Sequence, residues 1–134
     1  MRERQLVADL VSDVRLPKMF KVKQKFPRPK IEPEKIPDII HELLSEEKFA
    51  NQIKPGMRIA ITAGSRGIAN VALTTKCIAD FVKERGGKPF IVPAMGSHGG
   101  ATAQGQREIL EGYGIREEYV GCPIISSMEV KKIG

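Results

Sequence analysis

The fold is decided by two stretches, MRIAITAGSRG at residues 57–67 and KPFIVPAMGSHGG at residues 88–100. In each stretch a short apolar run, rich in β-branched residues, leads directly into a glycine-rich loop. Runs of this kind predict buried parallel strands, here over Met57–Ala63 and Lys88–Pro93. Each predicted strand therefore ends in a loop that carries polar side chains.

Helices are predicted after both strands. The apolar residues of 69–85 recur at helical spacing, and Gly86-Gly87 ends that helix in the usual way. A second helix is expected over 102–112, with Thr102 as its N-cap. Three further elements are expected: an amphipathic helix over 34–49, a turn at 116–120 and a third strand over 123–128.

This alternation of strand, loop and helix predicts an α/β domain. Right-handed crossovers make such strands parallel, so we expect a three-layer, Rossmann-like, mostly parallel sheet with helices on its faces. The 134 residues fit one domain, divided into an N-terminal strand or arm (1–30) and an α/β core (31–134). Ligands bind such sheets at the carboxyl ends of the strands, which is where both glycine-rich loops are predicted to lie.

The formal charge of +6 has a local origin, because residues 15–30 hold seven basic side chains and no acidic one. Within this segment, apolar residues alternate with lysines at nearly the period of a strand, which predicts a basic strand with one covered face. An anion-contacting face, for example toward nucleic acid, is the alternative. With 5% aromatic residues and no recognisable nucleic-acid motif, a nucleic-acid partner is not expected. The seven basic residues, with the apolar residues that alternate with the lysines, are Arg15, Lys18, Met19, Phe20, Lys21, Val22, Lys23, Lys25, Phe26, Arg28 and Lys30.

Composition and cysteine usage indicate a cytoplasmic protein. No apolar stretch approaches the roughly 20 residues that a membrane helix needs, so no membrane partner is expected. The first residues are not followed by the apolar run of a secretory signal. Cys77 and Cys122 are isolated and lack metal-ligand spacing, so both are expected to be reduced and unpaired.

The first loop, Gly64-Ser65-Arg66-Gly67, has the residue types of an anion site. Its two glycines allow a ligand to approach the backbone closely, and the helix that follows begins with free amide donors. Ser65 can donate a hydrogen bond and Arg66 can bind a planar anion through two parallel hydrogen bonds. The loop is neither a Walker A motif nor a GxGxxG fingerprint. A tight turn with a surface arginine is therefore the alternative.

The second loop, Gly96-Ser97-His98-Gly99-Gly100, places a histidine among three glycines. Histidine exchanges protons near neutral pH, so His98 is the candidate general acid/base of the chain. Ser97 and His98 are not expected to form a serine–histidine catalytic pair, because adjacent residues rarely align that way and no orienting acid is apparent. No chemical role is expected for His41, the only other histidine.

With both loops in place, residues from about 57 to 128 resemble the N-terminal domain of the nickel-pincer lactate racemase family. The resemblance rests on three stretches, GSRGIAN at 64–70, PAMGSHGGAT at 93–102 and SSME at 126–129. It is greatest for the less characterised relatives of the lactate racemases. It covers most of this chain and roughly the first third of a full-length family member.

The resemblance implies a two-domain isomerase of 2-hydroxy acids. Its cofactor, a nickel pincer nucleotide, takes a hydride from the α-carbon of the substrate while a histidine removes the hydroxyl proton. By motif, His98 matches that histidine, and Arg66 with Ser65 matches the loop that contacts a substrate or cofactor anion. Gly64, Gly67, Gly96, Ser97 and Gly99 are the remaining predicted substrate- or cofactor-binding residues. The implied partners are a small 2-hydroxy acid and the C-terminal domain of the full-length protein.

Several positions depart from the lactate racemases. Ala63 stands where the family has an acid, Ser65 where it has threonine, Gly67 where it has proline, and Gly99 where arginine follows the histidine. A different 2-hydroxy acid or a sugar acid is thus at least as well supported as lactate.

The chain ends at Gly134, before the family's cofactor-anchoring lysine, second catalytic histidine and nickel-binding histidine. We therefore expect it to carry half an active site, with no metal ligand, no bound cofactor and no activity by itself. The competing hypothesis is a non-enzymatic α/β domain that binds a nucleotide or phosphate at its two helix N-termini.

Overall fold

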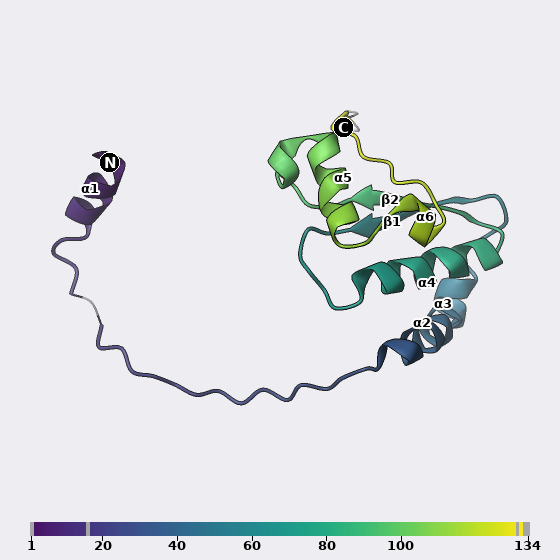
Figure 1. The fold of residues 1–134 in the computed structure, drawn as a ribbon, viewed down its shortest axis with the longest axis horizontal. Coiled ribbons are helices and arrows are strands. Elements are labelled where there is room, and N and C mark those ends of the chain that lie inside the picture. Colours follow the sequence, from purple (N-terminus) through teal and green to yellow (C-terminus); the bar gives the residue numbers. More distant parts are fainter. Residues whose placement is uncertain (1, 16, 131, 133–134) are drawn as a thin grey trace.

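The computed structural model describes residues 2–15, 17–130 and 132, and its centre is a parallel pair of strands (Figure 1). Strand β1 (Arg58–Ala63) pairs with β2 (Lys88–Pro93) so that Arg58 lies opposite Lys88 and Ala63 opposite Pro93. These bounds confirm both predicted strands to within one residue. The two strands are joined by helix α4 (Val71–Glu84), which confirms the predicted strand–helix–strand unit.

The expected third strand over 123–128 is reduced to a single bridge. Ile124 pairs in parallel with Ile91 of β2, but the ladder does not continue. Two residues later the Ser126 hydroxyl donates a hydrogen bond to the Ala103 carbonyl, 2.7 Å away. That contact draws the chain toward helix α5 (Ala103–Gly112) and away from the sheet edge. The described residues therefore hold an α/β domain with a two-stranded parallel sheet.

The core lies on one face of this sheet. Ile61 and Ile91 are opposite each other in the ladder and are both buried, and α4 and α5 pack against this face through residues such as Ala79 and Leu110. Ala60 and Thr62, which point to the other face of β1, are exposed. Within the part of the chain that the structure describes, no second helical layer covers these two residues, and the three-layer, Rossmann-like arrangement stays a prediction.

The C-terminal segment around Ile124 is held against this core by contacts of charged side chains. Glu117, at the start of helix α6 (Glu117–Val120), accepts a hydrogen bond from the Ile124 amide at 2.8 Å. Its carboxylate also lies 3.1 Å from the guanidinium of Arg107. The Ile124 hydrogen bond and the nearby arginine hold the pKa of Glu117 below its ordinary value. The segment that bridges to β2 is therefore fixed by polar contacts as well as by apolar packing.

Upstream, the helix predicted over 34–49 is interrupted. A short 3₁₀ turn, η1 (Pro33–Lys35), leads into α2 (Ile36–Leu44), and a separate turn of helix, α3 (Glu47–Ala50), follows. The interruption occurs where the Ser45 hydroxyl donates to the His41 carbonyl at 2.7 Å, a local bond that competes with helix continuation. Helix α2 packs beside α4, where His41 Nε2 lies 3.3 Å from a Glu84 carboxylate oxygen.

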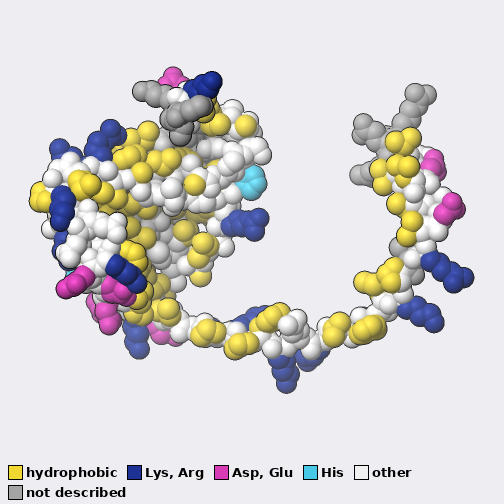
Figure 2. All heavy atoms as spheres, turned by 180° about the vertical axis from the view of Figure 1, so that it is seen from behind, with side chains coloured by type: hydrophobic (Ala, Val, Ile, Leu, Met, Phe, Trp, Pro, Cys, Tyr) yellow, Lys and Arg dark blue, Asp and Glu magenta, His cyan; other side chains and the backbone are white. Residues whose placement is uncertain are grey.

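The N-terminal arm differs most from the prediction. Residues 17–32 are extended, but they form no strand, because a strand needs a neighbour with which to pair its backbone groups. The predicted basic strand is thus not formed in this structure, and the apolar residues Met19, Phe20 and Val22 are more than four-fifths exposed. Figure 2 shows hydrophobic and basic side chains along this arm. Helix α1 (Arg2–Leu10), at its far end, was not predicted from the sequence.

The structure bears on two expectations drawn from composition. Cys77 and Cys122 are free, as expected, and burial raises the pKa of both thiols. Within the described ranges, none of the helices has the length and apolarity that a membrane crossing requires.

Candidate functional site

The parallel register places the two glycine-rich loops side by side. Ala63 and Pro93 are paired at the carboxyl ends of β1 and β2, and the Ala94 amide donates to the Ala63 carbonyl at 2.8 Å. The loop 64–70 and the loop 94–102 leave the sheet from these two positions. As predicted, both loops lie at the edge where parallel sheets bind ligands.

One side-chain contact joins the loops. Ser65 Oγ lies 2.5 Å from His98 Nδ1, although the two residues are 33 positions apart. Ser65 is half-buried and His98 is exposed. The partner of His98 is thus Ser65, which the sequence alone did not point to. Because Nδ1 is occupied by the serine, the reactive nitrogen that His98 can offer a ligand is Nε2.

The direction of this hydrogen bond decides what Nε2 can do. If Nδ1–H donates to Ser65 Oγ, Nε2 carries a free lone pair and can accept a proton. If the Ser65 hydroxyl donates to Nδ1, Nε2 carries the hydrogen and acts as a donor. Serine permits both directions, since its hydroxyl both donates and accepts. A fixed ring with a switchable Nε2 is suited to proton transfer in two directions.

Ser65 is itself held by a residue that the sequence analysis missed. The Tyr113 hydroxyl, at the end of α5, donates to the Ser65 carbonyl at 2.7 Å. Adding a Cβ to Gly67 would place it 3.7 Å from the Tyr113 ring, so this aromatic side chain also covers the end of the first loop. The signal in the sequence was weak: Tyr113 is one of only two tyrosines and stands between Gly112 and Gly114.

The His98 loop is held by a second residue that the sequence did not single out. The side-chain amide of Gln106 donates to the Gly96 carbonyl at 2.7 Å, and Gln106 is buried. Buried polar side chains are rare without a partner, and here the loop backbone provides one. Helix α5 therefore fixes both loops, through Tyr113 on one and Gln106 on the other.

Gly99 has a packing role in the structure. A Cβ on Gly99 would lie 2.4 Å from the Gly105 carbonyl carbon, and a Cβ on Gly105 would lie 2.0 Å from the Gly99 oxygen. Two glycines thus let the loop and the first turn of α5 touch backbone to backbone. The close approach that we expected Gly99 to offer a ligand is made to this helix. By contrast, a Cβ on Gly96 would meet nothing within 4 Å, so that stretch of backbone is open.

The other predicted residues lie around this pair. Arg66 is exposed beside Ser65 and, within the described ranges, has no carboxylate at salt-bridge distance. Ser97 is exposed beside His98, and its carbonyl accepts a hydrogen bond from the Ala101 amide. Gly64 is exposed at the start of its loop. Together these residues present one cationic group, one imidazole and exposed loop backbone at a single edge.

The described residues do not form a metal site. No group of three or more histidine, cysteine, aspartate or glutamate side chains in 2–15, 17–130 and 132 is placed to hold a metal ion. His41, the second histidine, contacts Glu84 and the edge of the Phe81 ring. The chemistry that these residues support by themselves is anion binding and proton transfer.

Comparisons of this chain with protein-family models, with curated proteins and with solved structures found no match. The resemblance to the lactate racemase family therefore rests on the three motifs alone.

The packing role of Gly99 can be tested by substitution, with Gly100 as the matched control. Gly99 and Gly100 have the same φ of 66°, but a Cβ on Gly100 would meet nothing within 4 Å. Gly100→Ala should cost only the left-handed backbone penalty, about 1 kcal/mol. Gly99→Ala should lower the free energy of unfolding by clearly more, because its Cβ would overlap the Gly105 backbone and α5 would have to move. Denaturant unfolding measures both, and equal losses of stability would contradict the packing role.

Proposed function

We propose that this chain is the N-terminal, substrate- and cofactor-binding half of a nickel-dependent racemase or epimerase of 2-hydroxy acids. The observation that carries the proposal is the contact between Ser65 Oγ and His98 Nδ1 at the edge where both strands end, with Arg66 beside it. The proposal includes the three-layer, Rossmann-like arrangement and the division into an arm (1–30) and a core (31–134). A C-terminal domain completes the site.

Each residue has a distinct task in this proposal. The guanidinium of Arg66 holds the substrate carboxylate, since arginine binds planar anions through two parallel hydrogen bonds. His98 Nε2 takes the proton of the 2-hydroxyl group and later returns it. Ser65 accepts from Nδ1–H, which keeps the Nε2 lone pair available and fixes the plane of the ring. The exposed backbone near Gly96 and Ser97 lies against the bound molecule.

The nickel cofactor is assigned to this function by the family resemblance. Since the described residues do not form a metal site, its metal ligands must come from outside them. Arg66 and the exposed loop backbone are suited to the negatively charged part of a nucleotide. The tasks given to this chain are therefore limited to anion binding, orientation and proton transfer at His98.

A non-enzymatic nucleotide- or phosphate-binding domain is the second candidate, and one observation favours it. Helix α4 begins after the first loop without a side-chain cap at Asn70, whereas α5 is capped by the Thr102 hydroxyl, which accepts from the Gly105 amide. An uncapped helix start at the end of the loop that carries Arg66 suits a phosphate group. In this candidate function, His98 does not take part in binding.

The catalytic role is tested in a protein that joins this chain to the second domain that the family has. His98→Ala should lower the rate of racemisation of a 2-hydroxy acid by at least about 100-fold, because the general acid/base is lost. His41→Ala is the matched control and should leave the rate unchanged. The rate is followed as loss of optical purity of a single enantiomer. Full activity of His98→Ala would contradict the proposal.

Ligand binding by the chain alone separates the two candidates. In an NMR titration, lactate and glycerate should shift the amide signals of Ser65 and His98, and propionate, which lacks the 2-hydroxyl group, should bind roughly tenfold more weakly. Arg66→Ala should weaken all three, whereas His98→Ala should remove only the preference for the hydroxyl group. Tighter binding of inorganic phosphate that is unaffected by His98→Ala would favour the non-enzymatic candidate.

A further inference from the structure

The sheet has an unpaired edge. Strand β2 has β1 on one side and the Ile124 bridge on the other, but within the described residues β1 has a neighbour on one side only. The backbone N–H and C=O groups on an open edge remain available for pairing with another strand. Proteins usually cover such an edge, so the outer side of β1 is a candidate docking surface.

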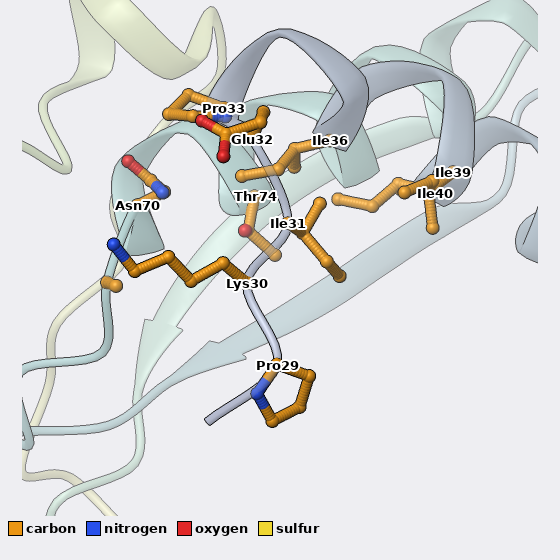
Figure 3. A pocket seen from close by; sticks show the side chains of 11 residues that line it. Pro29, Lys30, Ile31, Glu32, Pro33, Ile36, Ile39, Ile40, Asn70 and Thr74 are labelled. Carbon is orange, nitrogen blue, oxygen red and sulfur yellow. The ribbon is translucent and has the colours of Figure 1, made fainter. Parts of the chain in front are cut away.

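Helix α2 (Ile36–Leu44) is incompletely covered. Four residues of α4 are buried, but none of α2 is. A cavity of about 440 Å³ is lined by Leu44 of α2 and by Ile59 and Ile61 of β1. A second cavity, of about 650 Å³, is lined by Ile36, Ile39 and Ile40 at the start of α2 (Figure 3). The apolar face of α2 is thus left open, as expected for a helix whose neighbouring strand is missing.

Chain topology indicates which strand would fit there. A right-handed crossover from a strand through α2 into β1 puts that strand on the outer side of β1 and α2 on the same face as α4. Helix α2 packs beside α4, and Leu44 at its end lines one cavity together with Ile59 and Ile61 of β1, which is consistent with this arrangement. The segment that precedes α2 in the chain is the N-terminal arm. Residues 29–33, where the arm joins the core, line the larger cavity next to Asn70, at the start of α4 (Figure 3).

The arm carries a suitable sequence. In an extended chain Phe20, Val22 and Phe26 point to one side, and Lys21, Lys23 and Lys25 to the other. The apolar side matches the uncovered face of α2. The lysine side then lies on the same face of the sheet as Ala60 and Thr62 of β1, which are exposed. Docking in this orientation buries the apolar side chains and keeps the charges in water.

We infer that Met19–Phe26, which is unpaired and exposed in this structure, docks in solution as a third strand on the open edge of β1 in the same chain, parallel to β1, with Phe20, Val22 and Phe26 packed over α2. Residues 27–35 connect the docked strand to α2. The parallel direction follows from the connection, because the arm enters the body near the start of α4, which lies at the carboxyl end of β1. The inference depends on the sheet and α2 alone, so it stands or fails independently of the proposed activity.

Hydrogen–deuterium exchange of the chain tests this docking. Backbone amides of 19–26 should exchange at least about tenfold more slowly in the wild-type chain than in Val22→Asp, which puts a charge on the apolar side. Lys23→Asp, on the lysine side of the same strand, is the matched control and should keep the protection. Unchanged protection of α4 and β2 in all three proteins shows that the body remains folded.

The molecular mass, measured under the same conditions, shows whether any protection of 19–26 arises in a monomer or in a dimer. Protection of 19–26 in a monomer, lost in Val22→Asp, supports the inference. Exchange of 19–26 at the rate of an unstructured peptide in the wild-type chain overturns it. Protection found only in a dimer also overturns it, because the arm would then pair with a second copy.

Discussion

Ile61 and Ile91 face each other in the parallel ladder of β1 and β2, and both are buried against α4 and α5. The register of this pair determines which residues lie opposite each other along the rest of both strands. Two residues further on, Ala63 and Pro93 end the ladder together, so the two glycine-rich loops start from the same point. A shift of one residue in a strand would move Ile61 or Ile91 out of the core, which makes the alternative registers unfavourable. The contact between Ser65 and His98 depends on this register.

Helix α5 contributes the second constraint. Tyr113 holds the Ser65 carbonyl, Gln106 holds the Gly96 carbonyl, and Gly105 touches Gly99 through the backbone. The loops are therefore supported by the helix that follows the second of them. This arrangement explains how an exposed histidine on a loop with several glycines can keep a defined position. Positioning of this kind is what proton transfer requires, since the reacting groups must come within hydrogen-bond distance.

The sequence predicts local elements well and long-range contacts poorly. Both strands and helices α4 and α5 match the prediction to within two residues, because their apolar spacing, the Thr102 cap and Gly86 are local signals. The third strand was wrong, since its extent depends on a hydrogen bond from Ser126 to α5. The basic strand is not formed in this structure, because a strand requires a neighbour with which to pair. For the site, the residue types were predicted, but no local pattern reveals that Ser65 meets His98 across 33 positions.

The central claim is that Ser65 holds His98 through Nδ1 and leaves Nε2 for the ligand. The ¹⁵N NMR spectrum of the His98 imidazole tests it most directly, because the shifts of the two ring nitrogens show which one carries the hydrogen. In the wild-type chain we expect the hydrogen on Nδ1, and in Ser65→Ala we expect a shift toward the Nε2–H form that predominates in free histidine. Ser65→Thr, which keeps the hydroxyl group, should retain the wild-type pattern. Identical imidazole spectra for the wild type and Ser65→Ala would contradict the account.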